Sequence, residues 1–305
     1  MSNLAKFLGL TFLCLIWGLN WVAIKISLEG LSPFISASLR FILAVFLLFL
    51  YIKFKRISLK IDGRQFKLLL ITGFMTYVLD YGLIYWGEQY LSAGVTSIFF
   101  STFALFTAIL TNFLFKNEPF QWKKYIGIII GFMGIMVIFF DQLIRTQFSL
   151  KVILAITAVI LGALFAALPT VIIKKYLTQM RAELLTFYQM ALGTFFLVLV
   201  AVAVEYRQPV HLSLRIGLVL LYMGVMSSAA AFIIYYMLLK HMSAISLSFT
   251  IYVIPLVALV GDYLFYGQVL SLRSFIGMGV IFAGIWLSQG RIKRARAPEA
   301  PKAGG

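Results

Sequence analysis

The chain has 305 residues, of which 62% are hydrophobic and only 12% are charged. Soluble chains carry roughly a quarter charged residues, so the composition excludes an ordinary soluble protein and indicates extensive contact with lipid. The net charge is +16, but its placement in short segments between apolar runs does not indicate nucleic-acid binding. One cysteine and two histidines offer neither an internal disulfide nor a metal cluster, so we expect no metal and no other cofactor.

Ten apolar runs are long enough to cross the hydrocarbon core as helices, which takes roughly 20 residues. Polar residues do not alternate within them, which excludes the strands of a membrane barrel. The first run lacks the small-residue cleavage site of a signal peptide. The sequence therefore predicts an all-α integral membrane protein with ten transmembrane helices. The predicted spans are residues 5–27, 33–53, 66–87, 94–115, 122–141, 152–173, 183–204, 215–238, 246–267 and 272–289.

The sequence matches itself after a shift of about 150 positions. Segment 125–135 resembles segment 275–285, and Tyr85 corresponds to Tyr236 after a shift of 151. Each copy holds five apolar runs, and an odd number leaves the chain on the opposite side, so the second copy must enter the bilayer inverted. Inverted repeats in transporters place a binding site where the two copies meet. We expect a first five-helix repeat over 1–145, an inverted second repeat over 146–290, and a disordered basic cytoplasmic tail over 291–305.

Lysine and arginine are concentrated in alternate loops. If the N-terminus is cytoplasmic, most of the 26 basic residues fall on the same side as the loop at 54–65. Cytoplasmic loops of membrane proteins carry an excess of Lys and Arg. We therefore expect a multi-pass protein of the cytoplasmic (inner) cell membrane with both termini in the cytoplasm, and the lipid bilayer as its main surroundings.

Asp80 lies about fourteen residues into the third predicted span. At 1.5 Å per residue its carboxylate is about 21 Å along the helix, a depth at which an acid must face protein or water. A substrate amine or a coupling proton would give it a functional partner, and an ion pair with Arg40 or Lys25 would give it a structural one. Tyr77 and Tyr81 lie near Asp80 at helical spacing, and aromatic rings beside a carboxylate suit a cationic group.

The first two spans hold further polar candidates. Asn20 and Trp21 lie inside the first span, where a buried amide needs a partner from a neighbouring helix or from a ligand. Arg40 lies seven residues after Pro33 in the second span. Its guanidinium could attract a substrate carboxylate, but a structural pair with an acid or with backbone carbonyls is favoured. The candidate substrate-binding residues are Asn20, Trp21, Arg40, Tyr77, Asp80, Tyr81 and Tyr252.

Two prolines lie inside predicted helices. Because proline has no N–H, Pro169 and Pro255 deprive the carbonyls of Phe165 and Ile251 of their helical partners. Helices interrupted near the middle of the membrane are typical of transporter binding sites. We therefore interpret both prolines as helix breaks with a role in gating, and Tyr252, beside Pro255, as a cavity residue.

Glycines recur at short spacing in the fifth and tenth spans. Small residues on one face of a membrane helix let a second helix approach closely. We therefore expect close helix packing at Gly127, Gly131, Gly134, Gly277 and Gly284.

Several local motifs occur along the chain: Trp17 to Lys25, Ser32-Pro33, Arg40-Phe41, Leu91 to Gly94, Lys116 to Glu118, and Lys124 to Gly127 with Gly134. Together they resemble the EamA family of the drug/metabolite transporter superfamily. The resemblance covers roughly residues 5–290 and implies ten helices, cytoplasmic termini, a central cavity and the export or exchange of small metabolites. The family often has a proline midway through the fourth span, where this chain has Ala104 and Leu105, and a glutamate at the end of the ninth, where it has Gln268.

These observations predict a secondary transporter, with no catalytic residues, that moves a small metabolite by alternating access around a central cavity. An amino acid or an aromatic or amine compound, moved outward, is favoured. The alternative of the same fold is a nucleotide-sugar or cofactor exchanger, which would need more cavity cations than Arg40. An integral-membrane enzyme is disfavoured because the ten acids and two histidines are scattered. Coupling of transport to a proton or a counter-substrate is compatible with the sequence. The sequence does not indicate an oligomeric state.

Overall fold

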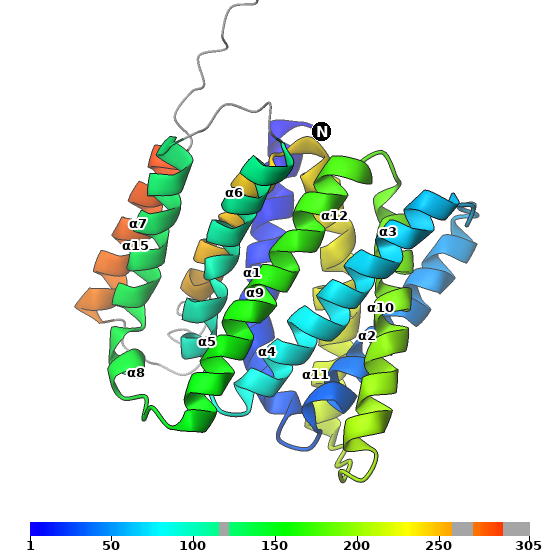
Figure 1. Ribbon diagram of the computed structural model, residues 1–305, viewed down its shortest axis with the longest axis horizontal. Helices are drawn as coiled ribbons and strands as arrows, with labels where there is room; N and C mark the ends of the chain where they lie inside the picture. The colour runs from blue at the N-terminus through cyan, green and yellow to red at the C-terminus, as the bar shows by residue number, and fades with distance from the viewer. Residues whose placement is uncertain (116–121, 258–270, 289–305) are drawn as a thin grey trace, which may run out of the picture.

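The computed structural model describes residues 1–115, 122–257 and 271–288, and these form helices joined by short loops, with no strand among them (Figure 1). The all-helical prediction is therefore confirmed. Within these ranges seven helices are long and apolar enough to cross a membrane. Four are single helices and three are composite: α1 (Asn3–Ser27), α2 (Pro33–Phe54), α9 (Leu150–Tyr176), α10 (Ala182–Glu205), Gly63–Glu88, Ala93–Leu114 and Leu214–His241.

The other three predicted spans are described over shorter stretches. The fifth is α7 (Trp122–Ile138), followed by α8 (Phe140–Ile144). The ninth begins with α13 (Ala244–Ser248), and its described helical part ends at Val257. The tenth is α15 (Leu272–Ser288). The remainder of the ninth span and the basic tail expected at 291–305 lie outside the described residues.

Polar side chains fix where many of the helices begin. A serine or aspartate before the first turn accepts a backbone N–H three residues further on, which satisfies one of the unpaired donors of that turn. The residues that do so are Ser2, Asp62, Ser92, Ser149, Ser213 and Ser243. At α2 the cap comes from far along the chain, because Glu205 Oε2 accepts both Ile35 N–H (2.9 Å) and the Ser32 hydroxyl (2.5 Å).

Two of the composite helices contain a π-helical segment. The helix Gly63–Glu88 consists of α3 (Gly63–Gly73), η1 (Phe74–Asp80) and α4 (Tyr81–Glu88). The helix Leu214–His241 consists of α11 (Leu214–Tyr222), η2 (Met223–Ala230) and α12 (Ala231–His241). π-Helical turns are rare and are frequently found at functional sites. Here η1 packs on α10 and η2 packs on α2.

Two predicted spans are interrupted, and neither interruption is at a proline. The fourth span divides at Ser101 into α5 (Ala93–Phe100) and α6 (Thr102–Leu114), and the ninth is interrupted at Phe249. Hydroxyls flank both points and bond to carbonyls three residues back, as Ser101 does to Ile98 (2.5 Å) and Thr250 does to Leu247 (2.8 Å). Such bonds compete with the helical ladder and bend helices.

The helix breaks expected at Pro169 and Pro255 are therefore not where the chain is interrupted. Helix α9 runs through Pro169, and the residues on both sides of Pro255 are helical. A proline removes one N–H from the ladder, and a membrane helix tolerates this loss when neighbouring helices support the surrounding turns. Pro169 is buried among such neighbours.

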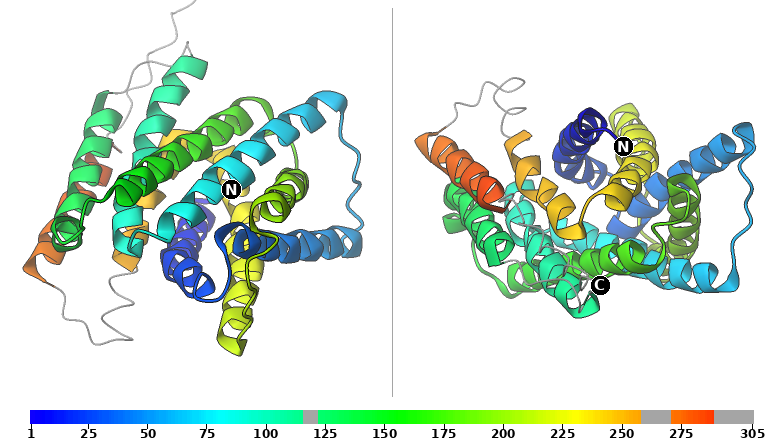
Figure 2. Two further views of the ribbon diagram at one scale, coloured as in Figure 1. Left: turned by 60° about the horizontal axis from the view of Figure 1, so that its bottom comes forward. Right: turned by 90° about the horizontal axis from the view of Figure 1, so that it is seen from above.

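Helices α7 and α15 pack along their whole length at one edge of the bundle (Figures 1 and 2). Their glycines face each other, so the backbones nearly touch. A Cβ added to Gly127 would lie 2.5 Å from the carbonyl oxygen of Gly284, and one added to Gly134 would lie 2.9 Å from that of Gly277. The prediction of close packing at these glycines is confirmed.

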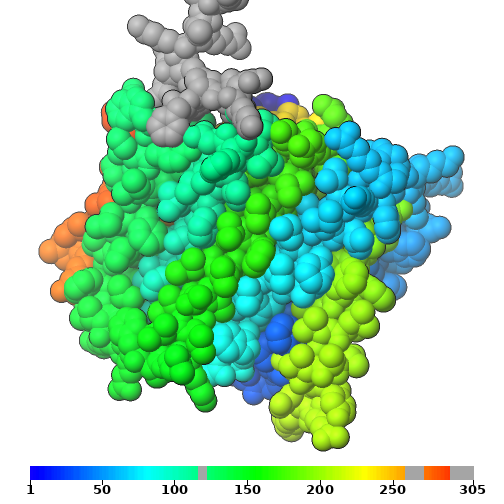
Figure 3. Space-filling view, in the orientation of Figure 1, coloured from blue at the N-terminus to red at the C-terminus, as the bar shows by residue number. Residues whose placement is uncertain are grey.

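The outside of the bundle is apolar, as a surface facing lipid must be. Large hydrophobic side chains such as Phe54, Phe113, Leu150 and Trp286 are more than two-thirds exposed. Figure 3 shows one outer face of the bundle, on which α6, α9, α3 and α10 lie side by side. The polar groups described below are therefore inside the bundle, where helices from both halves of the chain meet.

Candidate substrate-binding site

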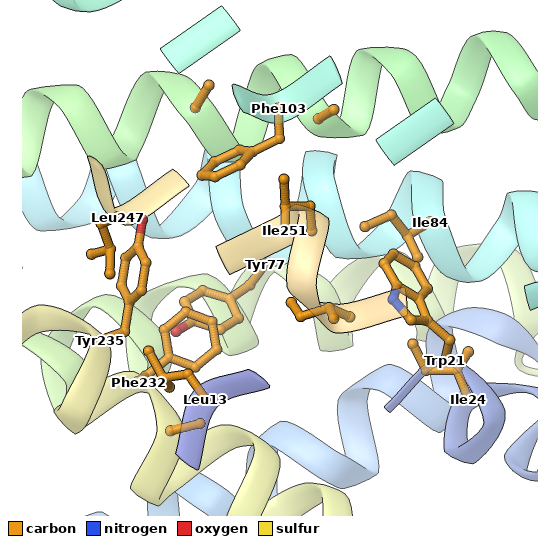
Figure 4. Close-up of a cluster of buried hydrophobic side chains, with 14 of the residues drawn as sticks. Leu13, Trp21, Ile24, Tyr77, Ile84, Phe103, Phe232, Tyr235, Leu247 and Ile251 are labelled. Carbon is orange, nitrogen blue, oxygen red and sulfur yellow. The ribbon is translucent and has the colours of Figure 1, made fainter. Parts of the chain in front are cut away.

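A cavity of about 110 Å³ lies among α1, η1, α4, α5, α6, α9, α12 and residues 250–257. Eight of its lining residues are aromatic: Trp17, Trp21, Tyr81, Phe100, Phe103, Phe232, Tyr235 and Tyr236. Figure 4 shows several of these side chains converging from different helices onto the buried core. The polar groups on the wall are Asn20, Thr76, Asp80, Thr170 and Thr250.

Asp80, the last residue of η1, lies on the cavity wall and is only 3% exposed. Its Oδ1 atom accepts no hydrogen bond from any described group. The structural ion pair considered from the sequence is not formed, because Lys25 Nζ donates to the backbone oxygen of Glu88 and Arg40 donates to hydroxyls. A buried carboxylate without a protein partner is costly in a membrane, so its environment favours a ligand that supplies one.

Arg40 is fully buried outside the cavity, where it joins α2 to η2 and α4. Its Nε donates to Ser228 Oγ (2.7 Å), and its terminal nitrogens donate to Ser227 Oγ (3.1 Å) and the Tyr85 hydroxyl (3.2 Å). The guanidinium also lies over the rings of Phe41 and Tyr81. Every arm of the side chain therefore has a protein partner. These contacts, with the backbone oxygen of Ser227 (3.4 Å) as a further acceptor and no acid among them, support the structural role favoured for Arg40.

Gln189, in α10, makes a similar junction between the composite helices Gly63–Glu88 and Leu214–His241. The Tyr236 hydroxyl donates to Gln189 Oε1, and Gln189 Nε2 donates to Thr76 Oγ1 (3.3 Å). Thr76 and Tyr236 both line the cavity. This Gln189 cluster therefore ties α10, α12 and η1 together beside the candidate site. We call the junction described above, made by Arg40, Tyr85, Ser227 and Ser228, the Arg40 cluster.

The other predicted site residues divide between the cavity and the core. Asn20, Trp21 and Tyr81 line the cavity, and Asn20 Oδ1 accepts a hydrogen bond from Ser227 Oγ (2.6 Å). Tyr77 lies outside the wall, where its ring packs against Phe41 and Tyr81.

The two site residues predicted around the ninth span also lie apart from the central cavity. Tyr252 donates to the backbone oxygen of Ile128 (3.0 Å), which joins its segment to α7. Pro255 lines a different pocket, described below, whereas Pro169 lines the central cavity itself. Tyr252 is thus a helix-packing residue in this structure.

Two further pockets adjoin the cavity. A wide pocket of about 740 Å³ includes Tyr90, Gln142, Arg145 and Pro255, and it shares Trp21 with the cavity. A narrow pocket of about 250 Å³ lies beside Lys240 and shares Tyr236 with the cavity. Trp21 and Tyr236 therefore lie where the cavity adjoins the two pockets.

Sequence reasoning missed the aromatic residues that α12 and the fourth span contribute to the wall. Phe232, Tyr235 and Tyr236 lie in a span that looks uniformly apolar, so composition alone does not show which face is buried. The one available signal was the correspondence of Tyr236 with Tyr85 across the repeat. Among the described residues no group of His, Cys, Asp and Glu could hold a metal ion.

Comparison with known proteins identifies relatives along nearly the whole chain. An uncharacterized transporter of Archaeoglobus fulgidus is 29% identical over 286 residues, which cover 94% of this chain and 98% of the relative. A second uncharacterized transporter of A. fulgidus is 30% identical and covers 92% and 98% of the two chains. The uncharacterized transporter YoaV of Bacillus subtilis is 22% identical and covers 92% and 95%.

A crystal structure of another protein shares the fold, with a TM-score of 0.79 at 14% identity and coverage of 94% of this chain and 97% of that one. The sequence profile of the EamA-like transporter family matches this chain twice, over residues 6–140 and 153–289. The relatives, the profile and the resemblance seen in the motifs agree. The chain therefore belongs to the EamA-like transporter family, within the drug/metabolite transporter superfamily of membrane proteins.

Proposed function

We propose that the protein is a ten-helix secondary transporter that moves a small metabolite by alternating access around the central cavity. The observation that carries this proposal is the cavity itself, which holds the unpartnered Asp80 between two separate pockets. A site that can open in turn to either pocket has the arrangement that alternating access requires. By the distribution of basic residues, the wide pocket faces outward and the narrow pocket faces the cytoplasm.

The proposal includes two inverted five-helix repeats, and several paired features support it. Both composite helices with π-helical segments, η1 and η2, occupy the third place in their halves, and both interrupted spans occupy the fourth. The Arg40 cluster joins Tyr85 to Ser227, while the Gln189 cluster joins Tyr236 to Thr76. Tyr85 and Tyr236 correspond after a shift of 151, as do Thr76 and Ser227. Each cluster thus binds one half of the chain to the other.

The proposed cargo is a small metabolite such as an amino acid or an aromatic or amine compound, moved out of the cell across the cell membrane, with both termini in the cytoplasm. A proton or a counter-substrate would supply the driving force. The aromatic and aliphatic side chains of the wall support a cargo with an apolar body. Its five polar residues are few, as expected of a site in which polar groups fix the orientation of a ligand.

Flux into liposomes tests this function. The purified full chain is reconstituted, and uptake of labelled tyrosine, leucine, tyramine and UDP-glucose is followed with and without a pH gradient. We expect uptake of at least one of the small metabolites well above that of protein-free liposomes. Uptake of UDP-glucose alone would favour the nucleotide-sugar exchanger, and no uptake of any compound would contradict the proposed transport activity.

We expect the Gln189 cluster to hold the cytoplasmic side of the cavity closed. Tyr236→Phe removes the hydroxyl that binds Gln189 but keeps the ring. One hydrogen bond contributes about 1 kcal/mol, so the open population should rise roughly fivefold. The measurement is the rate at which an impermeant maleimide, added from the cytoplasmic side, labels Ala166→Cys on the cavity wall in a Cys14→Ala background.

Tyr85→Phe is the matched control for this experiment, because Tyr85 holds the corresponding position in the Arg40 cluster. It should leave labelling from the cytoplasmic side unchanged. Equal acceleration by both substitutions would mean that a tyrosine hydroxyl stabilises the bundle generally, and the gating role of Tyr236 would then be wrong.

A further inference from the structure

The cavity wall holds one charged side chain among its described residues, and that side chain is an acid. Asp80 lines the cavity, whereas no lysine or arginine of the described chain does so. Arg40, which the sequence places well inside the second span, is fully buried behind the wall, with its nitrogens bonded to Ser227, Ser228 and Tyr85. The segment 258–270, which follows the lining residues Thr250, Ile251 and Ile254, contains no Lys or Arg in its sequence.

The rest of the wall suits a cation with an apolar body. Tyr81 is the residue after Asp80 in the sequence. Its ring lies against that of Phe232, with the ring centroids 6.3 Å apart. Trp17 packs against both Phe232 (5.9 Å) and Tyr235 (5.5 Å). Aromatic faces attract ammonium groups through their quadrupole, and this attraction is stronger where water is excluded.

The size of the cavity also limits the ligand. A water molecule needs about 10–15 Å³ of such space, so a cavity of about 110 Å³ has room for several water-sized groups. This favours a small compound, such as a benzene ring with a short ammonium-bearing chain. A phosphorylated or sugar-linked nucleotide is several times larger.

We propose that the substrate is a small organic amine without a carboxylate, whose ammonium group binds Asp80 and whose apolar body lies between the aromatic rings. This inference rests on the proposed transport function and narrows its substrate class. An amino acid would bring its own carboxylate into a cavity whose described wall offers no cation. Burying an ion without a partner is costly, so the zwitterion is disfavoured relative to the amine that lacks the carboxylate.

Tyramine and tyrosine make a matched pair of probes, because they differ only in the carboxylate. Liposomes containing the full chain are loaded with unlabelled tyramine and diluted into labelled tyramine at pH 7, with no pH gradient. Exchange of this kind needs substrate binding but no proton coupling. We expect transient accumulation of labelled tyramine above protein-free liposomes, and at least tenfold less exchange when tyrosine replaces tyramine on both sides.

Asp80→Asn should lower tyramine exchange by more than about tenfold, because the neutral amide loses the charge that pairs with the ammonium. Glu88→Gln is the control: Glu88 is also buried, in the same composite helix, and neither of its carboxylate oxygens accepts a hydrogen bond from a described group, but it does not line the cavity. Its exchange should stay within about twofold of the unmodified chain. A thermal melt verifies that both variants are folded.

Two results would overturn the inference while leaving the transport function intact. One is tyrosine or another amino acid exchanging as fast as tyramine or faster. The other is folded Asp80→Asn that keeps tyramine exchange but loses accumulation driven by a pH gradient, which would make Asp80 a proton site. Failure of every compound in the uptake panel would instead contradict transport itself, and the amine inference with it.

Discussion

Arg40→Met is expected to lower the free energy of unfolding by about 2–4 kcal/mol. The substitution removes the donors that bind Ser227, Ser228 and Tyr85. Ser227 keeps its bond to Asn20, and the Tyr85 hydroxyl keeps its bond to the sulfur of Met223. The Ser228 hydroxyl is left unpaired at a cost of about 1–3 kcal/mol, and the two other lost bonds add to that cost. Methionine is shorter but of similar volume, so little of the loss comes from an empty space. The free energy is measured by denaturant unfolding in detergent micelles, followed by tryptophan fluorescence.

Arg40→Lys separates the charge of the side chain from its geometry. Lysine keeps the positive charge but presents a single ammonium, which cannot reproduce the planar set of donors that reaches α4 and η2 together. We therefore expect its stability to fall between those of the unmodified chain and Arg40→Met. If Arg40→Met is as stable as the unmodified chain but loses transport, the structural role is wrong and Arg40 acts on the substrate.

The helices could be predicted because the bilayer constrains each span separately. A run must be apolar over its length and must end where the chain can leave the hydrocarbon. The prediction of a span at 33–53 corresponds to α2 (Pro33–Phe54), and that at 183–204 corresponds to α10 (Ala182–Glu205). These boundaries depend on residues that are close in sequence, and a single chain contains all of that information.

The partners of buried polar groups could not be predicted, because they depend on which helices become neighbours. Arg40 binds Ser227, 187 positions away, and Glu205 caps the start of α2 from 170 positions beyond Ile35. The sequence predicted an acid or backbone carbonyls as partners of Arg40, and a basic residue or a ligand as the partner of Asp80. The fold gives Arg40 three hydroxyls and one backbone oxygen. It leaves Asp80 without a described partner, so this aspartate is available to a ligand.

The positions of the helix interruptions were missed for a local reason. Proline is the strongest sequence signal for a broken helix, so the sequence predicts breaks at Pro169 and Pro255. The observed interruptions lie beside hydroxyl residues, such as Ser101 and Thr102, whose side chains bond to carbonyls in the preceding turn. Serine and threonine are common in membrane helices, so a single hydroxyl residue does not indicate an interruption. Only the recurrence of hydroxyl residues in both the fourth and the ninth span distinguishes these sites.

Gly284→Ala is expected to destabilise the protein, although alanine normally favours a helix over glycine by about 1 kcal/mol. In α15 the added Cβ would lie 2.6 Å from the carbonyl oxygen of Gly127 and 2.9 Å from the backbone nitrogen of Gly131. Backbone atoms cannot rotate away as side chains do, so α7 must move as a whole. Overpacking of this kind costs about 1–3 kcal/mol, and the melting temperature should fall accordingly.

Gly279→Ala, in the same helix, is the matched control, because a Cβ added there would have no described atom within 4 Å outside its own stretch of helix. It should leave the melting temperature unchanged or raise it, since only the helix preference of alanine acts there. Both variants are melted in the same detergent. The displacement of α7 also moves Gly131, which lies against the ring of Tyr252, so Gly284→Ala should slow transport as well. Equal melting temperatures for the two variants would show that α7 and α15 separate easily, and that their glycine contact does not hold the bundle together.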